Sequence, residues 1–239
     1  MSRHEPMFNV PGSVVAVLGL LAGVHLLLAA LPDSWGTWWT VALSFIPARY
    51  DGYAESLPGG SVAAVTSFLT YAALHGDIFH LAINSAWLLA FGGIVAIRTG
   101  PLRFFLFFAV CAVAGAVAFL IFNPGLMAPM VGASGAVSGL MGATMRFLFS
   151  ALDTDGLRAL RDDPQRVPLM PLGRALMDRR VLLVTGAFLV ANFLAVLGLG
   201  GVAAGGIAWQ AHLGGYFTGL LCYGFFERAP RSIHQISES

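Results

Sequence analysis

The sequence predicts an all-α integral membrane protein, built as a bundle of six transmembrane helices. Only 10% of its 239 residues are charged and 57% are hydrophobic, whereas a soluble domain carries about 25% charged residues. The apolar residues gather in runs long enough to cross a bilayer, and the arginines gather between alternate runs. A chain with this composition is expected to use the bilayer as its solvent.

A transmembrane helix needs about 20 predominantly apolar residues. Six runs approach that length, at about 13–31, 78–97, 102–122, 134–150, 181–199 and 206–226. The first run has 19 residues and exceeds the roughly 7–15 apolar residues of a signal peptide, so we interpret it as a retained helix. The prediction is one membrane domain at 13–226, between short tails at 1–12 and 227–239.

The segment 32–75 is predicted as a long outer loop that partly lies in the membrane surface. It contains a short apolar stretch at 35–48 with Trp35, Trp38 and Trp39. Tryptophan is enriched where the membrane meets water. The stretch is also too short to cross the hydrocarbon core.

The arginines predict the orientation. Six spans place both termini on one side, which then collects 12 of the 13 basic residues, and only Arg49 lies on the other side. The positive-inside rule puts the termini and the segment 151–179 in the cytoplasm. The segments 32–75, 123–133 and 200–205 then face outward. We expect 151–179, which contains several charges and prolines, to be a solvated connector.

Several classes of function lack support. The net charge of +1 offers no basic surface for nucleic acid, and there is no His-Glu-x-x-His motif or pair of intramembrane aspartates for a metalloprotease or aspartyl protease. A channel or transporter would need charged or broken helices near the midplane. Cys111 and Cys222 lie in apolar runs and are interpreted as small buried hydrophobic residues. We expect no metal and no cofactor.

Polar side chains inside transmembrane helices are costly and therefore mark candidate functional sites. The first candidate is Gly132-Ala133-Ser134-Gly135, where the fourth span begins. This pattern alone is weak, because Gly135 and Gly139 could serve close helix packing and Ser134 could cap the helix.

His212, in the last span, is the second candidate. Gly215 and Gly219 are four residues apart, so another helix can approach this face closely. His212 precedes Gly215 by three residues and points to the same neighbour. A lone membrane histidine is often only hydrogen-bonded to an adjacent helix, so this signal is also not decisive alone.

The second span supplies His80 and Asn84, which are four residues apart on one helical face and can both donate hydrogen bonds. Asp77 precedes the helix as its expected N-cap. Depth then links the three spans, measured from each site to a charged residue at the inner end of its helix. The rise is roughly 27 Å from His80 to Arg98, roughly 28 Å from Ser134 to Asp153 and roughly 22 Å from His212 to Glu227. All three sites are therefore predicted in one outer layer of a core about 30 Å thick.

This set suits acyl transfer. Ser134 needs a base because a hydroxyl is a poor nucleophile at neutral pH, and His212 can take its proton and pass it to the leaving amine. The backbone N–H of Ser134, at a helix N-terminus, could bind an oxyanion together with His80 and Asn84. No acid stands in the helices to orient His212, so a Ser–His dyad is favoured over a triad.

Together these motifs resemble the rhomboid intramembrane serine proteases over about residues 75–226. The resemblance implies a six-helix rhomboid-like bundle that cleaves transmembrane protein substrates near the outer membrane face. It implies Ser134 as nucleophile, His212 as base, and His80 and Asn84 as oxyanion donors, with Gly132 allowing close approach of the loop. Membrane lipid is the implied surrounding, and a bacterial inner membrane the implied location. The substrate and the oligomeric state stay open.

Two features depart from the family pattern. Some members carry an aromatic residue four positions after the nucleophile, stacked on the base, and here that position is Ser138. In the first outer loop, some members carry a Trp-Arg pair, and the comparable positions here are Thr66-Ser67.

A non-catalytic rhomboid-like chaperone or binding protein is the alternative function. The glycine-rich turn at 198–206 is expected to let the fifth span tilt for substrate entry.

Overall fold

The computed structural model of the chain describes residues 10–154, 156–198 and 208–228. In these ranges the regular structure is helical, apart from an isolated bridge between Phe45 and Met130. The longer helices are α1 (Gly12–Ala30), α4 (Ile78–Thr99), α5 (Pro101–Phe122), α6 (Ser134–Thr144), α10 (Arg179–Val196) and α11 (Trp209–Cys222). The shorter ones are α2 (Asp33–Leu43), η1 (Pro47–Tyr50), α3 (Gly60–Thr70), η2 (Tyr71–Ala73), α7 (Leu148–Leu152), α8 (Leu157–Asp162), η3 (Pro164–Arg166), α9 (Leu172–Ala175) and η4 (Tyr223–Phe225).

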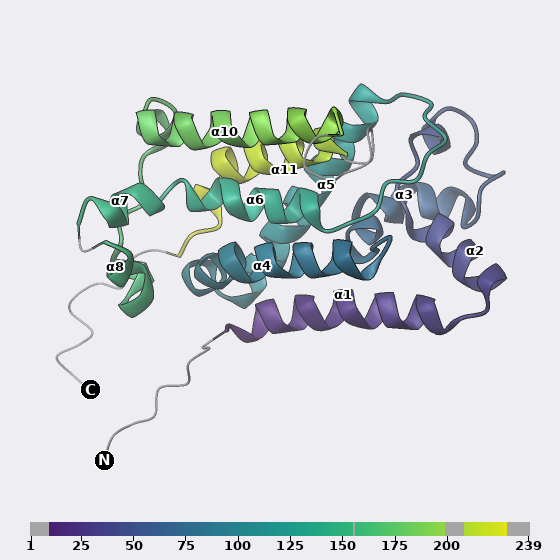
Figure 1. Cartoon of the computed structure of the whole chain (residues 1–239), viewed down its shortest axis with the longest axis horizontal. Coiled ribbons are helices and arrows are strands. Elements are labelled where there is room, and N and C mark those ends of the chain that lie inside the picture. The colour runs from purple at the N-terminus through teal and green to yellow at the C-terminus, as the bar shows by residue number, and fades with distance from the viewer. Residues whose placement is uncertain (1–9, 155, 199–207, 229–239) are drawn as a thin grey trace, which may run out of the picture.

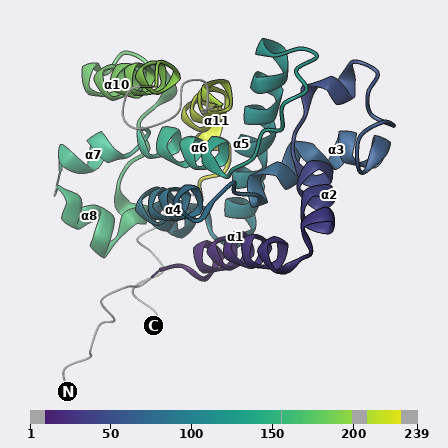
Figure 2. The ribbon, with the colours of Figure 1, turned by 45° about the vertical axis from the view of Figure 1, so that its right-hand side comes forward.

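Helix α6 occupies the centre of the bundle. It packs against α4, α5 and α11, while α1 lies on the far side of α4 and α10 lies outside α11 (Figures 1 and 2). Within an 18-residue window of α6 and α7, 78% of the residues are buried, against 11% in α10. The N-terminus of α6 faces the end of the bundle that carries α2 and α3, and its C-terminus faces α7 and α8 (Figure 1).

Five stretches in the described part of the chain are long and apolar enough to cross a membrane. They are α1, α4, α5, α6 continued by α7, and α10. Each corresponds to one of the predicted spans. The predicted sixth span at 206–226 is described from residue 208 onward, where α11 covers 14 residues. The glycine-rich turn at 198–206 lies, after Gly198, outside the described residues.

The fourth span does not run as one helix to residue 150. Helix α6 ends at Thr144, and α7 begins at Leu148 after a turn that contains Arg146. The Arg146 side chain is buried, and its guanidinium donates to the backbone carbonyls of Met170 (3.1 Å) and Leu220 (3.0 Å). A buried cation needs such partners, so Arg146 marks the early end of α6.

The segment 32–75 is more ordered than a plain loop, because α2 and α3 lie within it. It also pairs with the loop at 123–133. The backbone of Phe45 exchanges two hydrogen bonds with Met130, at 3.1 and 2.8 Å, and the Ala48 N–H donates to the Leu126 carbonyl. The two predicted outer loops therefore form one layer over the N-terminal end of α6.

The connector at 151–179 is predicted to be solvated, and about half of its described side chains are exposed, but several of its residues pack into the molecule. Leu160, Val167, Met170 and Ala175 are buried. Arg98, almost fully buried at the end of α4, donates to the carbonyls of residues 164 and 167 and pairs with Glu227. Buried arginines hold the connector in place, because backbone carbonyls of the connector supply the hydrogen-bond acceptors that a buried guanidinium group needs.

Candidate active site

Ser134 and His212 lie in contact, although 78 residues separate them in the sequence. The His212 Nε2 atom is 2.8 Å from the Ser134 Oγ atom. Ser134 is the first residue of α6, and its cap residue Ala133 makes no side-chain capping bond. The hydroxyl of Ser134 is therefore directed to the imidazole of α11 rather than used to cap its own helix.

Four glycines bring the two helices together. A Cβ atom at Gly215 would overlap the carbonyl oxygen of Gly135, and one at Gly219 would overlap the carbonyl oxygen of Gly139. The α6 and α11 backbones thus touch without intervening side chains, as small-residue motifs allow in membranes. This close approach lets short side chains such as those of Ser134 and His212 meet.

The turn before Ser134 is fixed by Gly132 and Tyr71. Gly132 has φ +121°, a conformation that favours glycine. Its N–H donates to the Tyr71 carbonyl at 3.0 Å, and the Tyr71 hydroxyl donates to the Ala112 carbonyl of α5 at 2.8 Å. Tyr71 is fully enclosed. Sequence reasoning did not identify it, since nothing in the local pattern pairs residues 71 and 132.

His80 lies beside this turn. A Cβ atom built at Gly132 would be 2.8 Å from both Cε1 and Nε2 of His80, and 3.8 Å from Ser134 Oγ. Only a residue without a side chain therefore fits between His80 and Ser134. The arrangement places a ring nitrogen of α4 next to the start of α6, where the backbone N–H groups have no acceptor within the helix.

Asn84 is buried one turn below His80. Its Nδ2 atom donates to the backbone carbonyl of His80 at 3.0 Å. One of the two N–H groups of the amide is thus engaged by its own helix, and the second remains a donor. The structure brings His80 to the site more directly than Asn84.

Asp77 caps α4, as predicted, and its carboxylate accepts from the His80 N–H at 2.8 Å. That hydrogen bond lowers the pKa of Asp77 below its usual range. His75, in the loop before α4, has its ring edge-on to His80 with centroids 5.0 Å apart. Burial, aided by the charge of His80, lowers the pKa of His75 to about 4.

Asn192 of α10 is a further polar residue at the site. Its Oδ1 atom is 2.7 Å from Nδ1 of His212. The sequence marks Asn192 as polar inside a span, yet the local pattern does not show which helix it faces. Ser138, one turn after Ser134 in α6, is buried.

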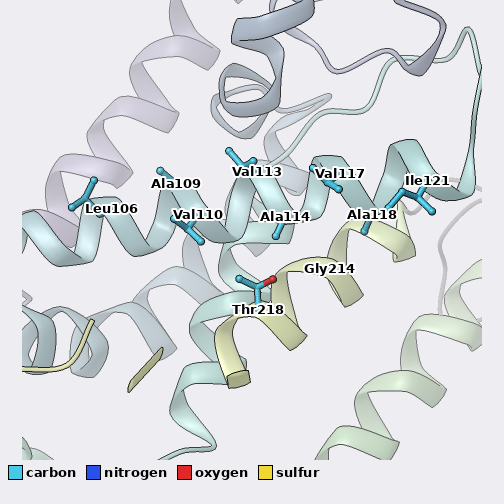
Figure 3. Close-up of a pocket in the computed structure, with 10 residues that line it drawn as sticks. All are labelled: Leu106, Ala109, Val110, Val113, Ala114, Val117, Ala118, Ile121, Gly214 and Thr218. Atoms are coloured by element: carbon cyan, nitrogen blue, oxygen red, sulfur yellow. The ribbon is translucent and has the colours of Figure 1, made fainter. Parts of the chain in front are cut away.

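Within the described residues, no three His, Cys, Asp or Glu side chains form a metal-binding group. A groove lies elsewhere on the molecule, between the surfaces of α5 and α11 (Figure 3). Its lining is apolar except for Thr218, and includes Val113, Val117 and Gly214. It contains none of the candidate site residues.

The family model of the Rhomboid domain matches residues 63–229, which is well over half of the chain and includes Ser134, His212 and His80. No curated protein matches the chain. The match shows that this chain belongs to the rhomboid family.

Proposed function

We propose that this protein is an intramembrane serine endopeptidase that cleaves transmembrane segments through a Ser134–His212 pair and an acyl-enzyme. Rhomboid proteins are generally intramembrane proteases, and some members are inactive. The observation that carries the proposal is the 2.8 Å approach of His212 Nε2 to Ser134 Oγ. This is hydrogen-bonding distance between a nucleophile and its base.

The chemistry follows from the two atoms. Nε2 of His212 accepts the Ser134 proton as Oγ attacks the substrate carbonyl carbon, which gives a tetrahedral oxyanion. The imidazolium then protonates the leaving amine, and the peptide C–N bond breaks to leave an ester on Ser134. Water, deprotonated by His212, hydrolyses the ester and restores the hydroxyl.

The oxyanion has donors within reach. The N–H groups at the start of α6 are free of helix acceptors, and the helix dipole adds partial positive charge there. His80 lies beside the same turn, and Asn84 can add the second N–H group of its amide. Each such donor contributes on the order of 10²–10³ in rate in enzymes of this kind.

The substrate class follows from the position of the site. The site lies between helices of a membrane domain, so its natural substrates are transmembrane proteins, surrounded by lipid. The peptide bond must leave its helical hydrogen bonds to reach Ser134, which favours segments that unwind easily. We further propose that both termini and the α7–α8 end are cytoplasmic and that Ser134 lies near the outer face of a bacterial inner membrane.

The deciding experiment is covalent labelling by a fluorophosphonate in detergent. The native protein should label, while Ser134→Ala and His212→Ala should not. Ser138→Ala, one turn along the same helix, is the matched control and should label like the native protein. Equal labelling of all four proteins would contradict the proposal and favour the non-catalytic chaperone or binding function.

Orientation is tested separately by single cysteines in a background without Cys111 and Cys222. A cysteine at Ser56, in the α2–α3 layer, should react with an impermeant maleimide added to intact cells. A cysteine at Gln165, in the connector, should react only after the membrane is opened. The reverse pattern would contradict the proposed topology.

A further inference from the structure

The hydrogen bonds of Asn192 define the state of the His212 ring. The Asn192 Nδ2 atom donates to the Phe188 carbonyl at 2.8 Å, and a carbonyl can only accept. The Oδ1 atom of the same amide therefore faces His212 Nδ1, at 2.7 Å. An amide oxygen can only accept, so Nδ1 must carry the proton. Nε2 is then left as the lone-pair atom that faces Ser134 Oγ.

We propose that Asn192 is the positioning residue of the catalytic base, selecting the tautomer of His212 and fixing the direction of its ring. The inference rests on the proposed protease function and deepens it, because it extends the Ser134–His212 pair to Ser134–His212–Asn192. An amide performs this role without the desolvation cost that a carboxylate would carry inside the bundle. It also explains how His212 is held in this protein, where Ser138 stands at the position of the aromatic residue that stacks on the base in some family members.

Asn192 belongs to a line of contacts between α10 and α11. The hydroxyls of Thr185 and Tyr216 share a hydrogen bond of 2.7 Å. The rings of Phe188 and Tyr216 stack with their centroids 4.7 Å apart. Residues 185, 188 and 192 share one helical face, as do His212 and Tyr216. The outermost of these contacts is the one between Asn192 and the base.

This location ties catalytic competence to α10. Among the candidate spans, α10 has the smallest buried share, at 11%. A displacement of its outer half away from α11 removes the acceptor from His212 Nδ1. The ring is then free to rotate or to change tautomer, which places a proton on Nε2 where the base needs a lone pair.

The test compares Asn192→Leu, which has nearly the same volume but no acceptor, with Asn192→Asp, which keeps an oxygen toward His212. The readouts are kcat and KM on a transmembrane substrate in liposomes, and the ¹⁵N chemical shifts of His212, assigned with His212→Ala. We expect Asn192→Leu to lower kcat at least about tenfold with KM within about twofold, as for loss of a transition-state interaction. Asn192→Asp should stay within about threefold of the native kcat.

The spectroscopic result is independent of activity. The native protein should show His212 protonated at Nδ1, and Asn192→Leu should shift the ring toward the Nε2-protonated tautomer. Thr185→Val removes a second α10–α11 hydrogen bond and is the matched control, with native tautomer and kcat expected. An unchanged kcat and tautomer in Asn192→Leu would overturn the inference, as would an equal loss in Thr185→Val. A native protein that shows the Nδ1 tautomer but neither labels nor cleaves would overturn the proposed function instead, and with it the catalytic role of Asn192.

Discussion

Gly215 of α11 lies directly against the carbonyl oxygen of Gly135 in α6, so that no side chain can be added between them. Gly219 and Gly139 repeat the relationship one turn further along. The separation of the two helices is therefore set by backbone atoms. Because Ser134 and His212 project from these same two helices, the 2.8 Å contact between them depends on that separation.

The substitution Gly215→Ala should reduce activity strongly. Its new methyl group overlaps the Gly135 carbonyl, so α6 and α11 must separate, and a misplacement of about 1 Å can cost about 10²-fold in rate. Overpacking should also lower the free energy of unfolding by about 1–3 kcal/mol. The measurements are cleavage of a transmembrane substrate and thermal unfolding in detergent.

The control for this change is Gly93→Ala in α4. A Cβ atom at Gly93 meets nothing within 4 Å, and alanine in a helix interior is favoured over glycine by roughly 0.5–1 kcal/mol. Gly93→Ala should therefore keep native activity, with a free energy of unfolding equal to or slightly above that of the native protein. If Gly215→Ala were as active as Gly93→Ala, the helix contact would not control the site.

Gly132→Ala should also slow fluorophosphonate labelling of Ser134, through the turn rather than the helix packing. Its φ of +121° is strained for any residue with a side chain, and the added Cβ would lie 2.8 Å from two atoms of the His80 ring. Strain of this kind costs on the order of 1–3 kcal/mol. We expect at least a tenfold lower rate of fluorophosphonate labelling.

Gly76→Ala serves as the comparison, because Gly76 lies in the same outer layer and a Cβ there meets nothing within 4 Å. It should label at the native rate. Native labelling by Gly132→Ala would show that neither the backbone conformation nor the His80 contact matters to the nucleophile.

Buried Arg146 should contribute more to stability than any exposed arginine. Arg146→Met leaves the carbonyls of Met170 and Leu220 without their donor, and an unsatisfied buried group costs about 1–3 kcal/mol. The free energy of unfolding should fall by roughly 2–4 kcal/mol. Arg166→Gln, which removes an exposed pair with Asp163, should change it by less than about 1 kcal/mol. Equal effects in a denaturant titration would contradict this account.

The sequence could predict those features of the fold and the site that depend on a single helix. Helical rise placed Ser134 and His212 at one depth, and the Asp77 cap followed from local pattern. It could not predict Asn192 as the partner of His212, because that contact depends on how α10 is rotated about its own axis against α11. Hydropathy alone does not define this rotation in a helix that faces lipid on most sides.

Contacts between distant segments also decide the packing at the α7–α8 end of the molecule, which the sequence did not predict. Arg98 and Arg146 are among the 12 arginines that the positive-inside rule assigns to the cytoplasmic side, where Arg commonly extends toward water. They are instead buried under the connector, whose carbonyls bind them. That arrangement requires the fold of 151–178, a segment without a repeating apolar pattern to indicate that it packs.

The stability of the outer layer should depend on pH through His75. Burial lowers the pKa of His75 to about 4 in the folded protein, whereas an unfolded histidine titrates near 6.5. Above about pH 6.5 both states hold the neutral ring, so His75 adds no pH dependence. Between about 6.5 and 4 the unfolded state binds the proton first, and stability falls as the pH falls.

The measurement is thermal unfolding in detergent from pH 4 to pH 8, compared between the native protein and His75→Gln. The native melting temperature should fall below pH 6.5, and the variant should lose part of that decline because glutamine does not titrate. His25→Gln, in α1, removes a smaller influence on the pKa of His75 than burial and should retain most of the decline. An identical decline in the native protein and His75→Gln would show that the buried imidazole is not the group that resists protonation.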